Sequence, residues 1–548
     1  MMRWVSFTAA VLFASSVAVV NAQVDYETQK WTASDASVDD SFGFAVALSG
    51  ELAIIGAYKD DDLAGGGGAA YIYNARTGQE LMQLHPSDYA PQDWFGSAVA
   101  INESYAIVGS MRDDDIATQA GGAYIFDAGT GVELGKFSPI DGSVDDYFGR
   151  CLAISGYTVV GGLSKDDDNG SSSGSAYLFD ARTGAIIDKL LPSDGAPLDY
   201  FGISVAIEGD LVVVGAFRDD DNGPSSGSVY LFDATTGAEL TKLLPDDGDS
   251  YDEFGSSVGI SGDTVIVGAL GDELGGTNGN SGSAYIFDVS DPLSPVQTHK
   301  LFPDDGSPAT LFGEAVSISN EFAVISRPFD DAAATSAGSA YLYNVESGEL
   351  ITKLLASDAA DGDKLGRAAA ISDNIVLLGA YEDDDHGEDS GSVYSFDFAP
   401  GVPYCFGPAP QCPCGNPGSS ESGCANSSGV GAQLSAFGSR SLSADAFTMS
   451  AKHLPQGPGL YFQGENTVNG GQGAFFGDGL RCAGGGVVRL EVQFSSGGTS
   501  NTTVSIATKG GVAAGQTKRY QFWYRDPVNS PCGSSFNLSN GYEVTWIP

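Results

Sequence analysis

Short runs of apolar residues alternate with Gly, Asp, Ser and Thr along most of the chain, and this pattern repeats at intervals of 53 residues, with one interval of 58. Each repeat unit contains four apolar runs, which in the fourth unit cover residues 201–207, 211–216, 228–233 and 239–244. Runs of this length between turn residues predict four strands, a to d, of an antiparallel meander. A Phe-Gly pair opens six units and a Leu-Gly pair the seventh, beginning at Phe42, Phe95, Phe148, Phe201, Phe254, Phe312 and Leu365.

Seven such units predict an all-β fold, a seven-bladed β-propeller with four-stranded antiparallel blades, over residues 23–400. The seventh unit ends after strand c, at 393–398, whereas residues 27–32 precede the first Phe-Gly pair and match the position of a strand d. We therefore expect the N-terminal strand to complete the last blade. This arrangement closes the ring and removes two exposed sheet edges.

Two more positions recur in every unit. A small residue follows two places after each glycine of the opening pair, as expected for the innermost strand: Ala45, Ala98, Cys151, Ser204, Ser257, Ala315 and Ala368. We therefore interpret Cys151 as a small buried residue rather than a reactive thiol. A tyrosine recurs in strand c, which indicates packing within blades rather than an aromatic binding stripe: Tyr71, Tyr124, Tyr177, Tyr230, Tyr285, Tyr341 and Tyr394.

The units resemble the FG-GAP repeat of the integrin α-chain propeller and its bacterial relatives. The Phe-Gly pairs match the first half of that motif, and Gly-Ala follows fourteen residues after Phe at Gly56, Gly215, Gly268 and Gly379. Gly109 and Gly162 keep only the glycine, and Ser326 replaces it in the sixth unit. The resemblance covers about residues 24–400 and implies a propeller used in adhesion, ligand binding or scaffolding. The family's calcium loop between strands a and b is replaced here by tight turns, so its ligands cannot be carried over.

Aspartates recur in three sets. The first lies in the b–c loops, where five Asp-Asp-Asp triplets occur: Asp60, Asp61, Asp62, Asp113, Asp114, Asp115, Asp166, Asp167, Asp168, Asp219, Asp220, Asp221, Asp383, Asp384 and Asp385. The second lies in the d–a connections: Asp35, Asp88, Asp141, Asp194, Asp247, Asp305 and Asp358. The third precedes the Phe-Gly pairs: Asp40, Asp93, Asp146, Asp199, Asp252 and Asp363, with Thr310 in the sixth unit. Because b–c and d–a connections share one face of a meander, we expect all of them on one side of the disc.

Such a face is electrostatically costly, because two carboxylates about 6 Å apart repel by roughly 0.7 kcal/mol in water. Oxygen ligands in Gly-containing loops suit Ca²⁺, which takes about six to eight oxygens. The five triplets are therefore predicted calcium ligands. The alternative is that these acids cap turns, accept hydrogen bonds from loop amides and keep the protein soluble. No other cofactor is expected.

The chain of 548 residues carries 71 acidic and 25 basic residues, a net charge of −46. This charge excludes a nucleic-acid-binding protein, whose affinity for phosphate needs clustered Lys and Arg, and it disfavours anionic membrane surfaces. Only four histidines occur, at His85, His299, His386 and His453. General bases and soft-metal ligands are therefore scarce.

The N-terminus has the pattern of an export signal. Arg3 precedes an apolar stretch, and Ala22 ends a small-residue cleavage motif, which predicts a signal peptide over residues 1–22. A signal anchor is the alternative. No other stretch reaches about 18 uninterrupted apolar residues, so no membrane span is expected after cleavage. We expect a secreted or cell-surface protein.

Composition changes at a Pro/Gly linker, residues 401–404, and the following 405–548 carry seven acidic and eight basic residues. Strand-like runs at 487–494, 503–507, 520–524 and 542–547 predict a β-sandwich-like domain. Six cysteines of this exported segment predict up to three disulfides among 15 possible pairings: Cys405, Cys412, Cys414, Cys424, Cys482 and Cys532. For the aromatic residues Trp523, Tyr524 and Trp546, core positions are favoured over a carbohydrate site.

The second domain resembles a C-terminal domain of large secreted planctomycete-type proteins. The stretches that carry this resemblance are 412–416 (Cys-Pro-Cys-Gly-Asn), 477–482 (Gly-Asp-Gly-Leu-Arg-Cys) and 523–527 (Trp-Tyr-Arg-Asp-Pro). The resemblance implies a bacterial, exported context and no particular activity.

These features predict a non-enzymatic extracellular binding or adhesion scaffold, which presents an acidic, calcium-loaded face to a protein or glycan. An enzyme usually breaks repeat symmetry with one convergent set of groups, whereas these acids recur blade by blade, and His386 is the only histidine among them. The abundance of paired carboxylates keeps open a secreted hydrolase or lyase acting on extracellular polysaccharide. A structural surface role is a third alternative. Neither the ligand nor the oligomeric state follows from the sequence.

Overall fold

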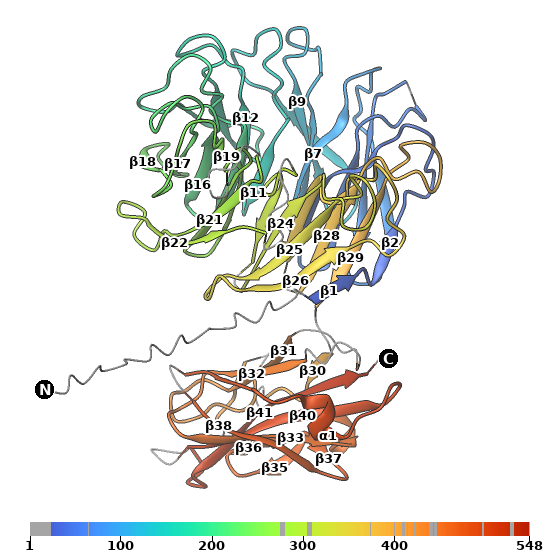
Figure 1. The fold of residues 1–548 in the computed structure, drawn as a ribbon, viewed down its shortest axis with the longest axis vertical. Helices are drawn as coiled ribbons and strands as arrows, with labels where there is room; N and C mark the ends of the chain where they lie inside the picture. Colours follow the sequence, from blue (N-terminus) through green and yellow to red (C-terminus); the bar gives the residue numbers. More distant parts are fainter. Residues whose placement is uncertain are drawn as a thin grey trace, which may run out of the picture.

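The computed structural model describes residues 23–63, 65–273, 280–303, 310–319, 321–372, 374–398, 401–407, 412–413, 415–419, 422–437, 442, 447–495, 498–526 and 531–546. It contains a β-propeller followed by a smaller β domain (Figure 1). The predicted signal peptide, Asp305 and Cys414 lie outside the described residues.

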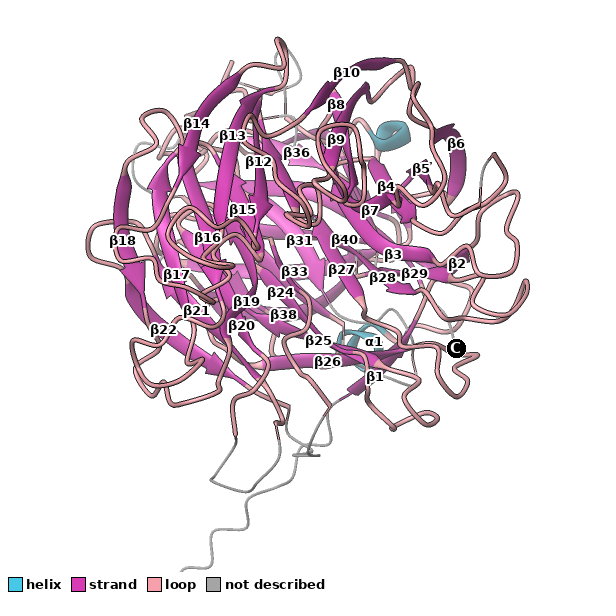
Figure 2. Cartoon of the chain, turned by 90° about the horizontal axis from the view of Figure 1, so that it is seen from above, coloured by secondary structure: helices cyan, strands magenta, loops and turns pink. Residues whose placement is uncertain are grey.

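Seven four-stranded antiparallel sheets form the blades, each in the order a-b-c-d predicted from the repeat, with strand a innermost (Figure 2). Blades 1 to 3 comprise β3 (Phe42–Ser49), β4 (Leu52–Ala57), β5 (Ala69–Asn74) and β6 (Gln79–Leu84); β7 (Phe95–Ile101), β8 (Tyr105–Ser110), β9 (Gly122–Asp127) and β10 (Glu133–Phe137); and β11 (Leu152–Ser155), β12 (Thr158–Leu163), β13 (Ser175–Asp180) and β14 (Ile186–Leu190).

The remaining blades follow the same plan. Blades 4 to 7 comprise β15 (Ser204–Glu208), β16 (Leu211–Ala216), β17 (Ser228–Asp233) and β18 (Glu239–Leu243); β19 (Phe254–Ser261), β20 (Thr264–Ala269), β21 (Ser283–Asp288) and β22 (Val296–Leu301); β23 (Val316–Ile318), β24 (Phe322–Arg327), β25 (Ser339–Asn344) and β26 (Leu350–Leu355); and β27 (Ala368–Ser372), β28 (Ile375–Ala380) and β29 (Ser392–Asp397) with β2 (Gln29–Trp31).

The N-terminal strand closes the ring as predicted. Strand β2 pairs antiparallel with β29, and Trp31 lies opposite Val393 in the register. The strand before it was not predicted: β1 (Gln23–Tyr26) pairs parallel with β26 and extends blade 6 to five strands. The N-terminal segment therefore joins blades 6 and 7.

Adjacent blades meet through glycine. The glycine of strand b lies against the carbonyl oxygen of the next blade's Phe-Gly glycine, so that a Cβ would overlap that oxygen: Gly56, Gly109, Gly162, Gly215, Gly268 and Gly379. The Phe-Gly glycines have φ between 85° and 96°, a conformation that side chains disfavour.

Cys151, beside one of these junctions, is a free thiol whose Sγ lies 3.1 Å from the Gly202 oxygen. Burial raises its pKa to about 11, in agreement with a packing role.

The C-terminal domain packs a larger sheet against a smaller one. The five-stranded sheet has the order β30 (Val402–Tyr404), β41 (Phe536–Thr545), β40 (Thr517–Arg525), β33 (Pro458–Gly464) and β38 (Val488–Phe494). The three-stranded sheet contains β31 (Gln433–Phe437), β32 (Thr448–Lys452) and β39 (Ser500–Asn501), and two short hairpins pair β34 (Asn466–Thr467) with β37 (Ala483–Gly484) and β35 (Ala474–Phe476) with β36 (Gly479–Arg481). Trp546 and Tyr524 are buried in the core between the sheets, which confirms their predicted core positions.

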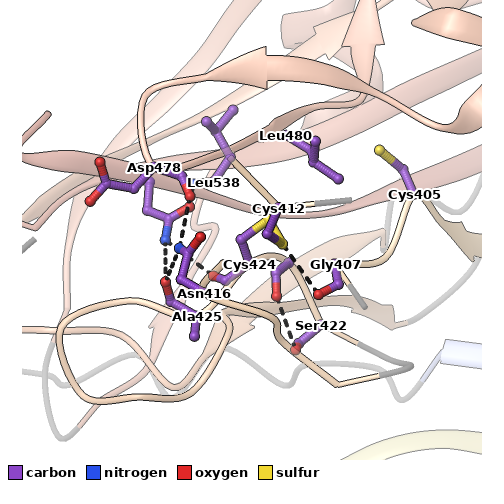
Figure 3. The surroundings of a disulfide bond; sticks show 12 residues. Cys405, Gly407, Cys412, Asn416, Ser422, Cys424, Ala425, Asp478, Leu480 and Leu538 are labelled. Atoms are coloured by element: carbon purple, nitrogen blue, oxygen red, sulfur yellow. Dashed lines mark hydrogen bonds between the residues drawn. A yellow bond between two sulfur atoms is a disulfide. The ribbon is translucent and has the colours of Figure 1, made fainter. Parts of the chain in front are cut away.

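Disulfide bonds cross-link this domain, as the cysteine count predicts. Cys405 pairs with Cys482 and Cys412 with Cys424, and Cys532 is also disulfide-bonded. Figure 3 shows the Cys412–Cys424 bond beside Asn416, whose amide donates to the carbonyl oxygens of Ala425 and Asp478.

One predicted strand of this domain is wrong. Residues 503–507 do not form a strand, because a short helix, α1 (Ile506–Gly510), begins there. The Ser505 side chain caps it by accepting from the Thr508 N–H at 3.1 Å, and Gly511 ends it in the left-handed region. A serine cap and a glycine stop outweigh the β-branched residues at 503 and 504.

The two domains touch on one face of the propeller. Lys452 of the C-terminal domain forms an ion pair with Glu321, which lies in the a–b turn of blade 6. The b–c and d–a loops are on the opposite face. Among the described residues, no helix is long and apolar enough to cross a bilayer.

Replacing Trp31 with Ala tests the closure. The indole is 4% exposed and stacks on Tyr73 of blade 1, with ring centroids 5.4 Å apart. We expect W31A to lose about 3–5 kcal/mol of unfolding free energy in urea titrations, the usual cost of truncating a buried Trp. The control I140A removes a side chain that is 83% exposed and should change stability by less than about 0.5 kcal/mol. Equal stability of the two variants would contradict the closing role of β2.

Candidate functional site

In five blades the strand-c tyrosine links the two acidic loops. In blade 4, the Tyr230 hydroxyl lies 2.8 Å from Asp194 of the d–a loop and 2.7 Å from Asp219, the first residue of the b–c triplet. Matching pairs surround Tyr71, Tyr124, Tyr285 and Tyr394. These contacts confirm that the two sets of loops lie on the same face.

A lysine of strand d completes this cluster. The Lys242 ammonium lies 2.9 Å from Asp194, 2.8 Å from Asp219 and 2.6 Å from Asp221. Lys30, Lys136 and Lys189 each bind three carboxylates in the same way, Lys300 binds two, and Lys353 binds Asp330. We call each group a lysine–carboxylate cluster.

Charge pairing shifts the pKa values inside these clusters. Burial acts to lower the pKa of Lys242, but hydrogen bonds to Asp219, Asp221 and Asp194 raise it above its ordinary value. Burial likewise acts to raise the pKa of Asp194, and hydrogen bonds from Lys242 and Tyr230 outweigh it, so the pKa lies below its ordinary value. Lys242 and Asp194 are therefore both charged at neutral pH.

The three residues of one triplet have three different roles. Asp219 is buried and contacts Tyr230, Asp220 accepts a hydrogen bond from the Ser225 N–H at 2.7 Å, and Asp221 binds Lys242. The middle residue does the same in other blades, where Asp114, Asp167 and Asp384 accept from loop amides. The first members of the other triplets are also buried, at Asp60, Asp113, Asp166 and Asp383, and the second and third members are exposed.

The carboxylates of one triplet thus diverge, and an ammonium occupies the point where acids from two loops converge. Two of these points have the oxygen arrangement of a metal site, with ligand atoms within 4.8 Å of one another: Asp88, Asp113 and Asp115; and Asp141, Asp166 and Asp168. In both, the lysine already supplies the positive charge. This geometry favours the alternative of turn-capping acids, while calcium binding stays a prediction.

Blade 1 is the exception, because glutamine replaces the lysine. Gln83 donates to Asp35 at 2.8 Å, and Tyr71 contacts Asp35 and Asp60. Burial raises the pKa of Asp62, and repulsion from Asp35 adds to it. Burial raises the pKa of Asp60 as well. Among its described residues, blade 1 therefore lacks the strand-d lysine that binds the matching carboxylates in the other six blades.

The strand-d lysines are not among the residues predicted from the sequence, although a signal for them is present. In blades 2, 3, 4 and 6 the lysine follows the strand-c tyrosine by twelve residues, and Gln83 stands at that spacing in blade 1.

The sixth blade differs in a second way, because it contains a buried arginine. The guanidinium of Arg327 donates to the hydroxyl of Thr310 at 2.6 Å. Substitution of Asp by Thr at position 310 thus accompanies an additional buried cation.

The acids that precede the Phe-Gly pairs form a separate, unpaired set. Asp40 is buried and accepts from the Ser37 N–H at 2.6 Å. Burial raises its pKa to about 7, and burial together with repulsion from Asp113 also raises the pKa of Asp93 to about 7. The pKa values of Asp199, Asp252 and Asp363 are raised by burial to about 6.

Lysine and glutamine can be interchanged at the matching strand-d positions of blades 4 and 1 to test whether the lysine stabilises its cluster. K242Q leaves three carboxylates without their cation and should lower the unfolding free energy by about 3 kcal/mol or more at pH 7.5. Q83K supplies blade 1 with the missing cation and should raise the midpoint of urea unfolding. K509Q, at an exposed lysine of the second domain, is the control for losing one positive charge outside a cluster. A loss in Q83K, or no loss in K242Q, would contradict the structural role of the lysine.

The free energy of unfolding should also decrease as pH rises from about 5 to about 8. A carboxyl whose pKa is raised in the folded state binds its proton more tightly there, so its contribution is present below the unfolded pKa, about 4, and is lost as pH rises through the folded pKa. We expect D40N/D93N to show a smaller decrease in melting temperature over this range than the wild type. D263N, at an exposed a–b turn, should keep the wild-type slope. Parallel curves of melting temperature against pH for all three proteins would contradict the raised pKa values of Asp40 and Asp93.

Comparison with known proteins agrees with this geometry. The family model of the FG-GAP repeat matches residues 26–73, 79–126, 132–179, 187–232, 238–287, 295–343 and 349–396. No curated protein sequence matches the chain. Each matched segment begins before a Phe-Gly or Leu-Gly pair and ends in strand c, and together the seven segments span more than half of the chain. The chain belongs to the FG-GAP repeat family.

Proposed function

We propose that this protein is an exported, non-enzymatic binding or adhesion scaffold, whose acidic loop face binds an extracellular protein or glycan. FG-GAP repeats indicate a propeller-type binding scaffold. The observation that carries the proposal is the repeated cluster itself, because it fixes the loops of one face in the same conformation around the ring. A preorganised surface loses little conformational entropy on binding.

The chemistry of the acids supports binding over catalysis. In six blades, the buried first acid of the b–c loop binds the strand-d lysine, so these carboxylates act in stability. The residues that remain exposed on this face recur from blade to blade, as in Asp114, Asp167 and Asp220. A repeated surface suits an extended partner better than a single bond-breaking step.

The placement of the second domain also supports this face as the binding surface. The Lys452–Glu321 ion pair joins the C-terminal domain to the a–b side of the propeller. The acidic loops on the other side remain accessible. Export is supported by the disulfides of the second domain, which form in oxidising compartments.

A binding panel tests this proposal. Purified extracellular polysaccharides and matrix proteins would be titrated with the mature chain, residues 23–548, in Ca²⁺ and in EDTA. We expect saturable binding to at least one class, weakened about tenfold or more by D39N/D61N/E388Q, which neutralises three exposed acids of the loop face. A dependence on Ca²⁺ would support the predicted metal, and its absence would argue against it.

The matched control is E51Q/E103Q/D263N, which removes the same charge from a–b turns on the opposite face. Binding should be unchanged in this variant. A panel without saturable binding, or equal weakening in both variants, would contradict the proposal that the loop face recognises the partner. Melting curves of both variants would verify that each remains folded.

A further inference from the structure

Basic residues predominate at the centre of the acidic face, although up to residue 400 the chain carries 64 acidic and 17 basic residues. At the positions directly before the b–c acids and directly after the opening pairs stand two acidic residues, Glu314 and Glu382, and six basic ones. Four of them stand directly before the Asp triplets: Lys59, Arg112, Lys165 and Arg218. Arg150 and Arg367 directly follow the Phe-Gly and Leu-Gly pairs that open the innermost strands of blades 3 and 7. We call these six residues the axial cations.

The axial cations differ from the strand-d lysines in their partners. Arg367 forms an ion pair with Glu314 at 3.3 Å. The other five axial cations form no ion pair within the part of the chain that the structure describes. In a chain of net charge −46, cations with no carboxylate partner are unexpected.

Aromatic rings hold these cations in place. The Arg112 guanidinium lies 3.4 Å from the centroid of the Trp94 ring, and Lys165 lies 4.5 Å from that of Tyr147. Arg218 lies over Tyr200 at 5.2 Å. Cation–π stacking fixes the side chain while leaving the N–H donors free. The Nε of Arg112 is buried and has no acceptor among the described residues.

Trp94 belongs to a continuous belt of aromatic rings on one side of the axis. Phe44 contacts Tyr381 and Tyr58, with centroids 5.5 and 4.3 Å apart, and Tyr58 contacts Trp94 at 5.0 Å. Arg367 lies 4.9 Å from the Phe44 ring and completes the belt next to blade 7. Four aromatic rings in contact and two stacked arginines, Arg367 and Arg112, thus lie together on this side of the axis.

An axial cavity lies farther along the innermost strands, toward the a–b turns. The cavity, of about 280 Å³, is lined by the innermost strands, with aliphatic side chains such as Val46, Val99 and Ile154. Phe44 and Arg150 each stand two residues before a lining residue, Val46 and Leu152, on the side of the strand that faces the acidic loops. Phe44 and Arg150 therefore lie at the acidic end of the axis, outside the cavity itself, and we call this end the axial mouth.

We infer that the axial mouth is a binding site for an anionic sugar, a uronate or sulfated residue at the end of a glycan. This inference rests on the proposed binding function and names the chemistry of its partner. Guanidinium and ammonium donors bind carboxylate or sulfate oxygens, and aromatic faces pack on the C–H face of a sugar ring. The surrounding acids repel an extended polyanion, so a short or terminal anionic unit fits where a long one does not.

Calorimetric titration of the mature chain with defined oligosaccharides tests the site. The probes are trigalacturonate, its methyl ester, a sulfated trisaccharide, a neutral trisaccharide and hexaglutamate. We expect trigalacturonate or the sulfated sugar to bind and to quench Trp94 fluorescence, with affinity falling as salt rises. The ester and the neutral sugar should bind at least about tenfold more weakly, since they lack the charge that the donors recognise.

Matched charge variants separate this site from the acidic periphery. R112Q/R218Q should weaken binding of the anionic sugar about tenfold or more, because two charged donors are lost. R76Q/R182Q removes the same charge from c–d turns on the opposite face and should bind as the wild type does. D39N/D61N/E388Q should tighten binding, because repulsive acids are removed, whereas the same variant weakens a partner held by the acidic periphery.

These opposite effects distinguish the two proposals. If no anionic sugar binds while a partner from the panel still requires the peripheral acids, the axial site is overturned and the binding scaffold stands. Tighter binding of hexaglutamate than of either anionic sugar would replace the glycan with an acidic peptide and overturn the inference. Equal weakening by R112Q/R218Q and R76Q/R182Q would likewise exclude the axial mouth.

Discussion

Close contact between two glycine backbones, at six of the seven blade junctions, governs the whole propeller. A Cβ on the strand-b glycine would overlap the carbonyl oxygen of the next blade's opening glycine, as at Gly109 beside Gly149. The opening glycine in turn needs a positive φ, 87° at Gly149. Together these requirements account for both glycines of the repeat. At the blade 6–7 junction, where Ser326 replaces the glycine, the opening Gly366 lies against the Ser326 side chain.

This spacing determines where the charged groups lie. Because each blade repeats the same strand order, its b–c and d–a loops recur on one face, and the lysine of strand d contacts acids of both loops, as Lys242 does. Six ammonium groups thereby lie among carboxylates that would otherwise repel one another. A buried cation of this kind is costly to remove but need not add net stability over an apolar alternative. Its clearer effect is to fix the loop conformation, in which Asp220 then caps the turn at Ser225.

Periodicity in the sequence was enough to predict the blades, the closing strand and the common face of the acids, because these depend on spacing alone. The clusters were not predicted, since the lysines belong to a different strand from the triplets and blade 7 takes Lys30 from the far end of the chain. The β1 strand was missed for a related reason: its pairing with β26 is an extra edge contact that no repeat encodes. In the second domain, local capping at Ser505 decided the helix against an apolar strand pattern.

Opposite charges can coexist a few residues apart because neighbouring side chains in the b–c loop point in different directions. Asp113 points into the blade toward Tyr124 and Lys136, whereas Arg112 stacks on Trp94 near the axis. Stacking prevents the guanidinium from folding back onto the exposed acids of its own loop. The aromatic residues next to the opening pair therefore separate the two zones, and the repeat that fixes the blades also keeps a positive centre within a negative face.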